Sequence, residues 1–266
     1  MYKFSSFIIF LFLIITTSSC SDYQKLLNNG TTLEKNNAAN EFYESGDYRK
    51  ALNLYVQLVN SFKGKPQHQR LVFFLANCYF QTKDYYLASY QYENFVKSYP
   101  KSNRVIEATY MQAKSQFMLS PRFSLDQTET DKAIDLLQIF IDKYPNSEFT
   151  PEVNSYIQQL QEKLEKKNFE ISKQYYTIRD YRAAINSIDN FIADNPGTIY
   201  REEALYYKFL SSFEIAVNSI VQKKNQRLKS TEKIYLNILK YYPESIFKED
   251  LDEKIKIVNK ELNNLN

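Results

Sequence analysis

Residues 71–100 read LVFFLANCYFQTKDYYLASYQYENFVKSYP, and this stretch decides the fold. Its second half carries the small residue Ala88, then the apolar pair Phe95-Val96, then Tyr99-Pro100. A small side chain lets two helices approach closely, and an apolar pair can face a neighbouring helix. Proline ends a helix because it has no backbone N–H to donate. The stretch therefore predicts a helical hairpin.

The same spacing recurs along the chain. Small residues head four further copies, and an apolar pair follows each at the same distance: Ala51 with Leu58-Val59, Ala133 with Phe140-Ile141, Ala184 with Phe191-Ile192, and a degenerate Thr231 with Ile238-Leu239. Proline then closes the copies at positions 145, 196 and 243, whereas Lys63 replaces it in the first. The alternative is an irregular all-helical domain in which these spacings coincide by chance. Because the copies share the same spacing, we favour a repeat protein over an irregular helical domain.

Residues 71–100 fit the tetratricopeptide pattern, whose period is about 34 residues. The residues at its expected offsets are Leu75, Ala76, Tyr79, Ala88, Tyr92 and Pro100. We predict an all-α fold, an α-solenoid of about five tetratricopeptide-like helical hairpins with a C-terminal capping helix. The expected repeats are 33–66, 67–101, 102–147, 148–198 and 199–245, with the capping helix at 246–266.

The anchors are unevenly spaced, which predicts insertions. In the third repeat, Pro121 ends the first helix and either Thr130 or Asp131 is expected to cap the second. The fourth repeat should open at Thr150-Pro151 and continue as one long helix from Val153 to Tyr176. The fifth carries a basic insertion, which we expect to be a loop, with Lys223, Lys224, Arg227 and Lys229.

The N-terminus indicates export. An apolar run from Phe7 to Ile15 is too short to span a bilayer, and small residues follow it up to Cys20. We expect residues 1–19 to be a lipoprotein signal peptide, Cys20 to be the lipid attachment site, and residues 20–32 to be a polar tether. An ordinary secretory signal with a coincidental cysteine is the alternative. The remaining cysteine, Cys78, is expected to be a small buried hydrophobe.

The residue types in this sequence give little support for a catalytic function. The single histidine, His68, has no second His or Cys nearby to complete a metal site or a nucleophile and base pair, and we expect it to face solvent at a helix start. A formal charge of +3 on 266 residues is too small to imply nucleic-acid binding. We expect no catalytic residues, no metal, no cofactor and no nucleic-acid partner.

A solenoid of helical hairpins offers instead a concave face, which the first helix of each repeat lines and which suits an extended peptide. The tetratricopeptide register places seven residues of the first two repeats on it: Asn40, Tyr43, Arg70, Phe73, Asn77, Phe80 and Gln81. Asn40 and Asn77 fall at equivalent positions, and a carboxamide can donate to and accept from a peptide backbone. Alternatively, both asparagines only bond neighbouring helices.

The whole pattern resembles the BamD (YfiO-type) family of outer-membrane assembly lipoproteins. The residues that carry the resemblance are Tyr144-Pro145-Asn146-Ser147 with Thr150, and Tyr175-Tyr176-Thr177 with Arg179, Ala184, Asp194, Pro196 and Thr198. The insertion Leu125 to Thr128 and the segment Ala133 to Tyr144 look like the form found in Bacteroidetes. The resemblance implies a lipid-anchored protein on the periplasmic face of the outer membrane. It also implies C-terminal repeats that dock a BamA-like insertase and N-terminal repeats that engage unfolded β-barrel proteins.

We expect the partner surface on the fourth and fifth repeats to include Tyr176, Arg179 and the basic insertion, since arginine and tyrosine are favoured interface anchors. Alternatively, the lysines are only solvated surface charge, and Arg179 ties its own turn together through a local carboxylate. Two rival classes stay open. One is another periplasmic tetratricopeptide adaptor, working with cell-envelope or division machinery. The other is a surface lipoprotein that binds nutrients alongside a transporter.

Overall fold

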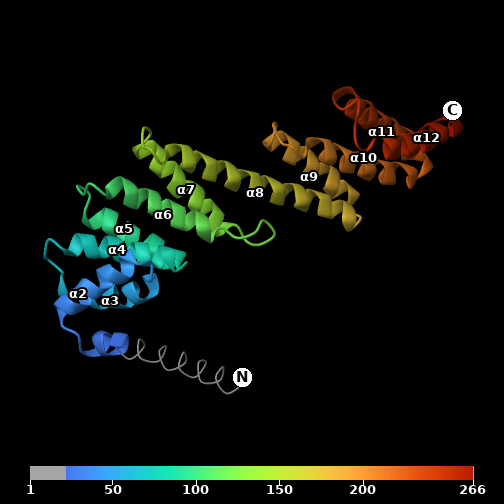
Figure 1. Cartoon of the computed structure of the whole chain (residues 1–266). Coiled ribbons are helices and arrows are strands. Elements are labelled where there is room, and N and C mark those ends of the chain that lie inside the picture. Colours follow the sequence, from blue (N-terminus) through green and yellow to red (C-terminus); the bar gives the residue numbers. More distant parts are fainter. Residues whose placement is uncertain (1–21, 266) are drawn as a thin grey trace, which may run out of the picture. The chain divides into compact units, whose positions relative to one another are not determined.

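The computed structural model describes residues 22–265, and within that range the chain is helical without a strand (Figure 1). Residues 22–29 form a short helix. The labelled helices are α2 (Thr32–Glu44), α3 (Tyr48–Ser61), α4 (His68–Gln81), α5 (Tyr85–Ser98), α6 (Val105–Leu119), α7 (Thr128–Lys143), α8 (Thr150–Thr177), α9 (Tyr181–Asp194), α10 (Arg201–Val217), α11 (Val221–Tyr241) and α12 (Lys248–Leu265). The order is that of consecutive hairpins followed by one further helix, which confirms the predicted all-α hairpin fold.

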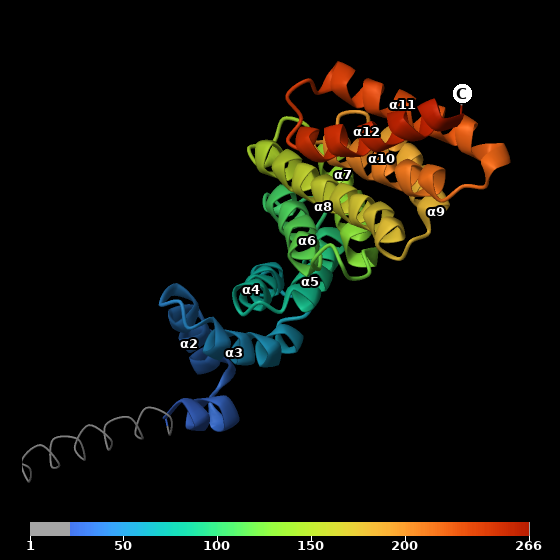
Figure 2. The same cartoon turned by 90° about the vertical axis from the view of Figure 1, so that its right-hand side faces the viewer.

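The described chain divides into two compact units. The first holds the residues up to Pro121 and then Asp126–Gln158, and the second holds Arg122–Leu125 and everything from Gln159. Helix α8 contributes to both. Within the first unit α2 packs on α3, α4 on α5 and α6 on α7, and within the second α10 packs on α9, α11 and α12 (Figures 1 and 2).

The small anchor residues all lie at helix contacts. Four of them, Ala51, Ala88, Ala133 and Ala184, are fully buried. Thr231 is buried as well, and its hydroxyl lies 2.7 Å from the Ser212 hydroxyl, so the polar group at this degenerate anchor has a partner. The anchor position is therefore buried in all five hairpins, as a close approach of two helices requires.

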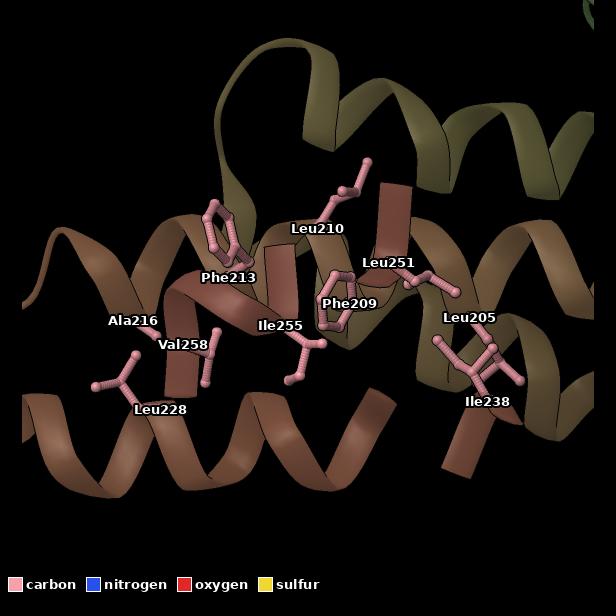
Figure 3. Close-up of a cluster of buried hydrophobic side chains, with 10 residues drawn as sticks. All are labelled: Leu205, Phe209, Leu210, Phe213, Ala216, Leu228, Ile238, Leu251, Ile255 and Val258. Atoms are coloured by element: carbon pink, nitrogen blue, oxygen red, sulfur yellow. The ribbon is translucent and has the colours of Figure 1, made fainter. Parts of the chain in front are cut away.

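The two members of each apolar pair differ in burial, and they differ in the same way in every repeat. Their first members are buried and their second members are half-buried; the first members are Leu58, Phe95, Phe140, Phe191 and Ile238. In the second unit Ile238 belongs to the largest core cluster, together with Leu205 and Phe209 of α10 and Leu251 of α12 (Figure 3). The capping helix thus closes the core that the last hairpin leaves open.

The turn inside a hairpin repeats the same construction three times. Aspartate is the N-cap of the second helix in each: Asp47 accepts from the backbone N–H of Lys50, Asp84 from that of Leu87, and Asp180 from that of Ala183. The residue just before each aspartate has positive φ, namely Gly46, Lys83 and Arg179. A left-handed residue followed by a capping carboxylate lets the chain reverse within a few residues.

The turns between repeats share a second construction, which we did not predict. A hydroxyl two residues after the closing proline accepts the N–H of the residue two further on: Ser102 from Arg104, Ser147 from Phe149, Thr198 from Tyr200, and Ser245 from Phe247. Three of these last residues are aromatic and stack on a ring of the preceding repeat. The ring centroids are 4.3 Å apart for Tyr110 and Phe149, 4.9 Å for Phe169 and Tyr200, and 4.1 Å for Tyr206 and Phe247. In the remaining turn Arg104 lies 4.6 Å from the centroid of the Phe73 ring.

The segment expected to be a tether over residues 20–32 is folded from residue 22 onward. Its short helix packs Tyr23, Leu26 and Leu27 against the first hairpin. The Tyr23 ring meets Phe42 edge to face at 5.6 Å, and its hydroxyl donates to the Lys50 carbonyl at 3.2 Å. Cys20 and the expected signal peptide, residues 1–19, lie outside the described residues.

The third repeat differs from the prediction in one detail. Helix α6 ends at Leu119 before Pro121, as expected, but α7 begins at Thr128 rather than after Thr130 or Asp131. The Asp126 carboxylate accepts the Thr128 N–H at 2.9 Å, and this bond starts the helix early. Thr130 is instead fully buried inside α7 and donates to the Gln127 side chain.

Cys78 is buried without a disulfide, and burial raises the pKa of its thiol to about 12. The thiol is therefore protonated at neutral pH and packs as a small apolar group. Among residues 22–265, no helix has both the length and the apolar character that crossing a membrane would require.

Candidate functional site

The predicted groove residues of the first two repeats lie on α2 and α4. Asn40 is half-buried, and its side-chain oxygen accepts from the Tyr55 hydroxyl at 3.0 Å and from Arg70 at 3.4 Å. This asparagine therefore links α2 to both α3 and α4. Asn77 bonds within its own helix, where the Gln81 amide donates to it at 3.5 Å. The two asparagines at equivalent positions thus have different partners.

An aromatic and arginine cluster adjoins Asn40. The Tyr43 ring stacks on Phe74 with centroids 4.6 Å apart and an interplanar angle of 18°. Two guanidinium groups lie over the same Phe74 ring, Arg70 at 4.9 Å and Arg104 at 5.5 Å. Burial raises the pKa of Tyr43 to about 12, so its hydroxyl is a neutral donor at physiological pH. Tyrosine and arginine are residues that protein interfaces favour.

Phe73 is a correction to the predicted groove. Its side chain is 1% exposed and meets Tyr92 and Phe95 edge to face, with centroids 5.8 and 5.4 Å away, so it belongs to the core. Phe74, the next residue, is half-buried and supplies the ring that the prediction assigned to Phe73. Successive side chains on a helix point about 100° apart, so a one-residue error changes the face.

The remaining predicted groove residues are Phe80 and Gln81, and His68 lies at the start of the same helix. Phe80 is half-buried and meets the Tyr85 ring edge to face at 5.4 Å, and Gln81 is exposed. His68, expected to face solvent, is half-buried, and its Nδ1 bonds the Tyr99 hydroxyl. No cluster of histidine, cysteine or carboxylate side chains that could hold a metal ion occurs in the part of the chain that the structure describes. The surface can contact a polypeptide, and no side chain on it is arranged as a nucleophile with a base.

The second candidate surface surrounds the turn before α9. Tyr176 contacts the rings of Tyr181 at 5.7 Å and Tyr207 at 5.4 Å, and Arg179 is exposed. Both residues line a cavity of about 600 Å³ with Thr177, Tyr181, Glu214 and Asn218. An exposed arginine beside half-buried tyrosines is a typical anchor for a partner protein.

The basic insertion does not form the loop that we expected. Lys223, Lys224, Arg227 and Lys229 all lie in α11, which runs from Val221 to Tyr241. Lys224 pairs with Glu261 of α12 at 2.7 Å, and Arg227 donates to the Ser219 hydroxyl at 2.7 Å. These two cations hold the last helices together, whereas Lys223 and Lys229 are exposed. The side chain of Leu228 is fully buried, and its packing favours a helix over a loop in this segment of α11.

Sequence comparison finds related proteins. Two curated relatives are named "Outer membrane protein assembly factor BamD". The one from Helicobacter pylori is 28% identical over 38% of this chain and 46% of its own length. The one from Caulobacter vibrioides is 21% identical over 66% of this chain and 57% of its own length. The chain therefore spans about half the length of the curated relatives it matches.

One solved structure, described as MamA protein, is 17% identical over 80% of this chain and 92% of that chain, with a TM-score of 0.32. Such a score carries no functional conclusion, so the assignment depends on the sequence comparisons. The family model described as "YfiO: Outer membrane lipoprotein" matches residues 31–186 and 168–266, which include both units and both candidate surfaces. The chain belongs to the YfiO family of outer membrane lipoproteins.

Proposed function

We propose that this chain is a non-enzymatic scaffold for outer-membrane β-barrel assembly, held by a lipid on Cys20 to the periplasmic face of the outer membrane. The observation that carries the proposal is the family match, which extends from residue 31 to residue 266. The curated relatives are named as assembly factors of outer membrane proteins. Surfaces suited to polypeptides, on repeats without an arranged nucleophile, agree with a scaffold.

The proposed insertase contact is the second candidate surface. A BamA-like protein would place a periplasmic domain against Tyr176 and Arg179, with the Arg179 guanidinium free of the core and able to meet a carboxylate. Lys224 and Arg227 already have partners inside the unit, whereas Arg179, Lys223 and Lys229 are exposed. Of these three, Arg179 lines the cavity, so the test is made there.

The proposed contact for unfolded barrel segments is the first candidate surface. Its useful groups are the stacked pair Tyr43 and Phe74, the Arg70 guanidinium, and the amide of Asn77. Together they offer ring faces for apolar side chains and amide groups for an extended backbone.

The insertase contact is tested with Arg179→Glu. We expect the variant to capture less BamA-like protein from crosslinked membranes, with unchanged helical content and melting temperature. Lys83→Glu is a matched control, because Lys83 holds the same position and backbone conformation in the turn of the second repeat. Equal capture by wild type and both variants would contradict the proposed contact.

Depletion of the protein tests the function as a whole. Barrel proteins are expected to fall in the outer membrane and to accumulate as soluble or degraded precursors. Normal barrel levels after depletion would instead favour another periplasmic tetratricopeptide adaptor.

A further inference from the structure

A third surface lies on the second unit and shares no residue with either candidate surface. It is a groove of about 720 Å³ in which α9 and α11 form the walls and α10 contributes the floor. Ile185 and Asp189 of α9, with Leu205 and Lys208 of α10, line one part of it, and the segment of α11 from Lys233 to Lys240 lines the rest.

The groove has a preformed apolar interior. Leu205 is 6% exposed and belongs to the same core cluster as Ile238 and Phe209, so the core fixes the floor (Figure 3). On the wall, Leu236 is 59% exposed, and Ile185 and Ile234 are half-buried. An exposed leucine next to two half-buried isoleucines gives a partner apolar area to cover.

The charges of the groove are unbalanced. Its single acid, Asp189, is engaged by Lys208 across the floor at 2.5 Å. Lys233 and Lys240 are exposed, and neither forms an ion pair with another of residues 22–265. The Lys240 ammonium lies 5.6 Å from the centroid of the Tyr241 ring. Two cations without acidic partners therefore flank the apolar wall.

These features favour one kind of occupant. The groove is open along one side, so a lipid chain in it would keep part of its length in water. An amphipathic protein helix fits better, because its apolar face can cover Leu236 while acidic residues beside that face meet the lysines. A second copy of this chain does not supply such a helix through α12, whose first turn is acidic. The apolar residues Leu251, Ile255 and Val258 of α12 are already buried in its own unit.

We propose that this groove binds an acidic amphipathic helix of a partner protein, independently of the insertase contact at Arg179. Apolar contact with Leu236 gives the helix its position, and Lys233 and Lys240 select for negative charge. The pairing is electrostatic at an exposed rim, so it weakens as salt screens the charges.

The test is a photocrosslink from the full-length lipoprotein in its own membranes, with benzoylphenylalanine in place of Leu236. We expect an adduct that maps by mass spectrometry to a net negative segment with apolar residues at helical spacing. Val56 is the matched control position, since it follows Ala51 at the interval at which Leu236 follows Thr231 and is 46% exposed. Lys233→Glu combined with Lys240→Glu should lower the adduct yield about fivefold. Lys256→Glu with Lys260→Glu makes the same charge change at exposed sites outside the groove and should not lower it.

Each other outcome overturns the proposal. These outcomes are a lipid adduct, an adduct to a segment without acidic residues, a yield no higher than from Val56, and a yield that the double lysine reversal leaves unchanged. Arg179→Glu separates this groove from the proposed function. We expect that variant to lose insertase capture and keep the adduct, and loss of the adduct as well would show that the groove is not an independent site.

Discussion

Lys83 and Arg179 occupy the same position in the turns of two different repeats, with φ angles of 65° and 64°. Gly46 fills that position in the first repeat with a φ of 83°. Residues with a side chain adopt this left-handed conformation at a cost of about 1–2 kcal/mol. The turn therefore imposes the conformation whichever residue stands there. The side chain at this position can then serve another function, such as the proposed contact of Arg179.

Substitutions at this turn position test that reasoning. Gly46→Ala should lower the free energy of unfolding by about 1 kcal/mol, and Lys83→Gly and Arg179→Gly should raise it by up to about 1 kcal/mol. A Cβ at Gly46 would meet no atom within 4 Å, so the loss would be purely conformational. Urea unfolding followed by circular dichroism measures these changes. Gly197→Ala is the control, because a Cβ there is also uncrowded but the backbone is not left-handed. The same loss at both glycines would contradict the argument.

The stacked pair Tyr206 and Phe247 is expected to join the last hairpin to α12. Their rings lie 4.1 Å apart at an angle of 8°, and the Tyr206 hydroxyl donates to Asp250 at 3.0 Å. A double-mutant cycle with Tyr206→Leu and Phe247→Leu should give a coupling energy of about 0.5–1.5 kcal/mol from thermal or urea unfolding. Ile246→Ala, at a side chain that is 83% exposed, should have little effect. Additive losses at the two aromatic positions would mean that the stack contributes nothing specific.

Acid should weaken the contact between α6 and α8. Glu152 accepts from the Tyr110 hydroxyl at 2.6 Å, from Lys114 at 3.0 Å and from the Tyr156 hydroxyl. These bonds, that of Tyr110 foremost, lower the pKa of Glu152 from 4.5 to about 2. Because the folded state lowers this pKa, the stabilisation is present above pH 4.5 and is lost as the pH falls toward 2. The side chain is 45% exposed, so we expect less than about 1 kcal/mol.

Melting curves of wild type and Glu152→Gln between pH 6 and pH 2 check this expectation. The melting temperature of wild type should exceed that of the variant at pH 6, and the difference should shrink as the pH falls. Tyr110→Phe removes the strongest donor and should shift the loss of stability to higher pH. A constant difference between wild type and Glu152→Gln across this range would contradict the assignment.

The proposed lipid anchor gives a prediction about localisation. Cys20→Ala should release the protein from the outer-membrane fraction, since a thioether lipid at this residue is the attachment we propose. Fractionation with lipid labelling measures both effects, and Cys78→Ala is the control because that thiol is buried. Retention of the Cys20 variant in washed membranes, with no lipid label on wild type, would exclude the anchor.

The hairpins could be predicted because their signal combines residue size with spacing. Ala88 and Ala184 are small where helices meet, and proline follows at a fixed interval, so each repeat supports the register of the others. The choice between Phe73 and Phe74 could not be made in this way. Both are large and apolar, and only packing against Tyr92 and Phe95 decides which ring is buried.

Other elements have a helical pattern in the sequence, but the polar or basic residues around it favour a different interpretation. Tyr23, Leu26 and Leu27 have the spacing of one helical face, but the polar residues around them suggested a tether. The basic insertion suggested a loop, although the buried Leu228 lies within it. The recurring aromatic residue after the inter-repeat hydroxyl was visible at Phe149, Tyr200 and Phe247 and could have predicted the stacks.

The short helix at residues 22–29 limits the length of chain between the proposed anchor at Cys20 and the folded part of the protein. Tyr23 is bonded to the Lys50 carbonyl, and only two residue steps separate Cys20 from Asp22. Two steps of extended chain reach at most about 7 Å. A lipid on Cys20 would therefore hold the first hairpin directly at the headgroups. The height of that repeat above the bilayer would then depend on the folded body itself and not on a flexible spacer.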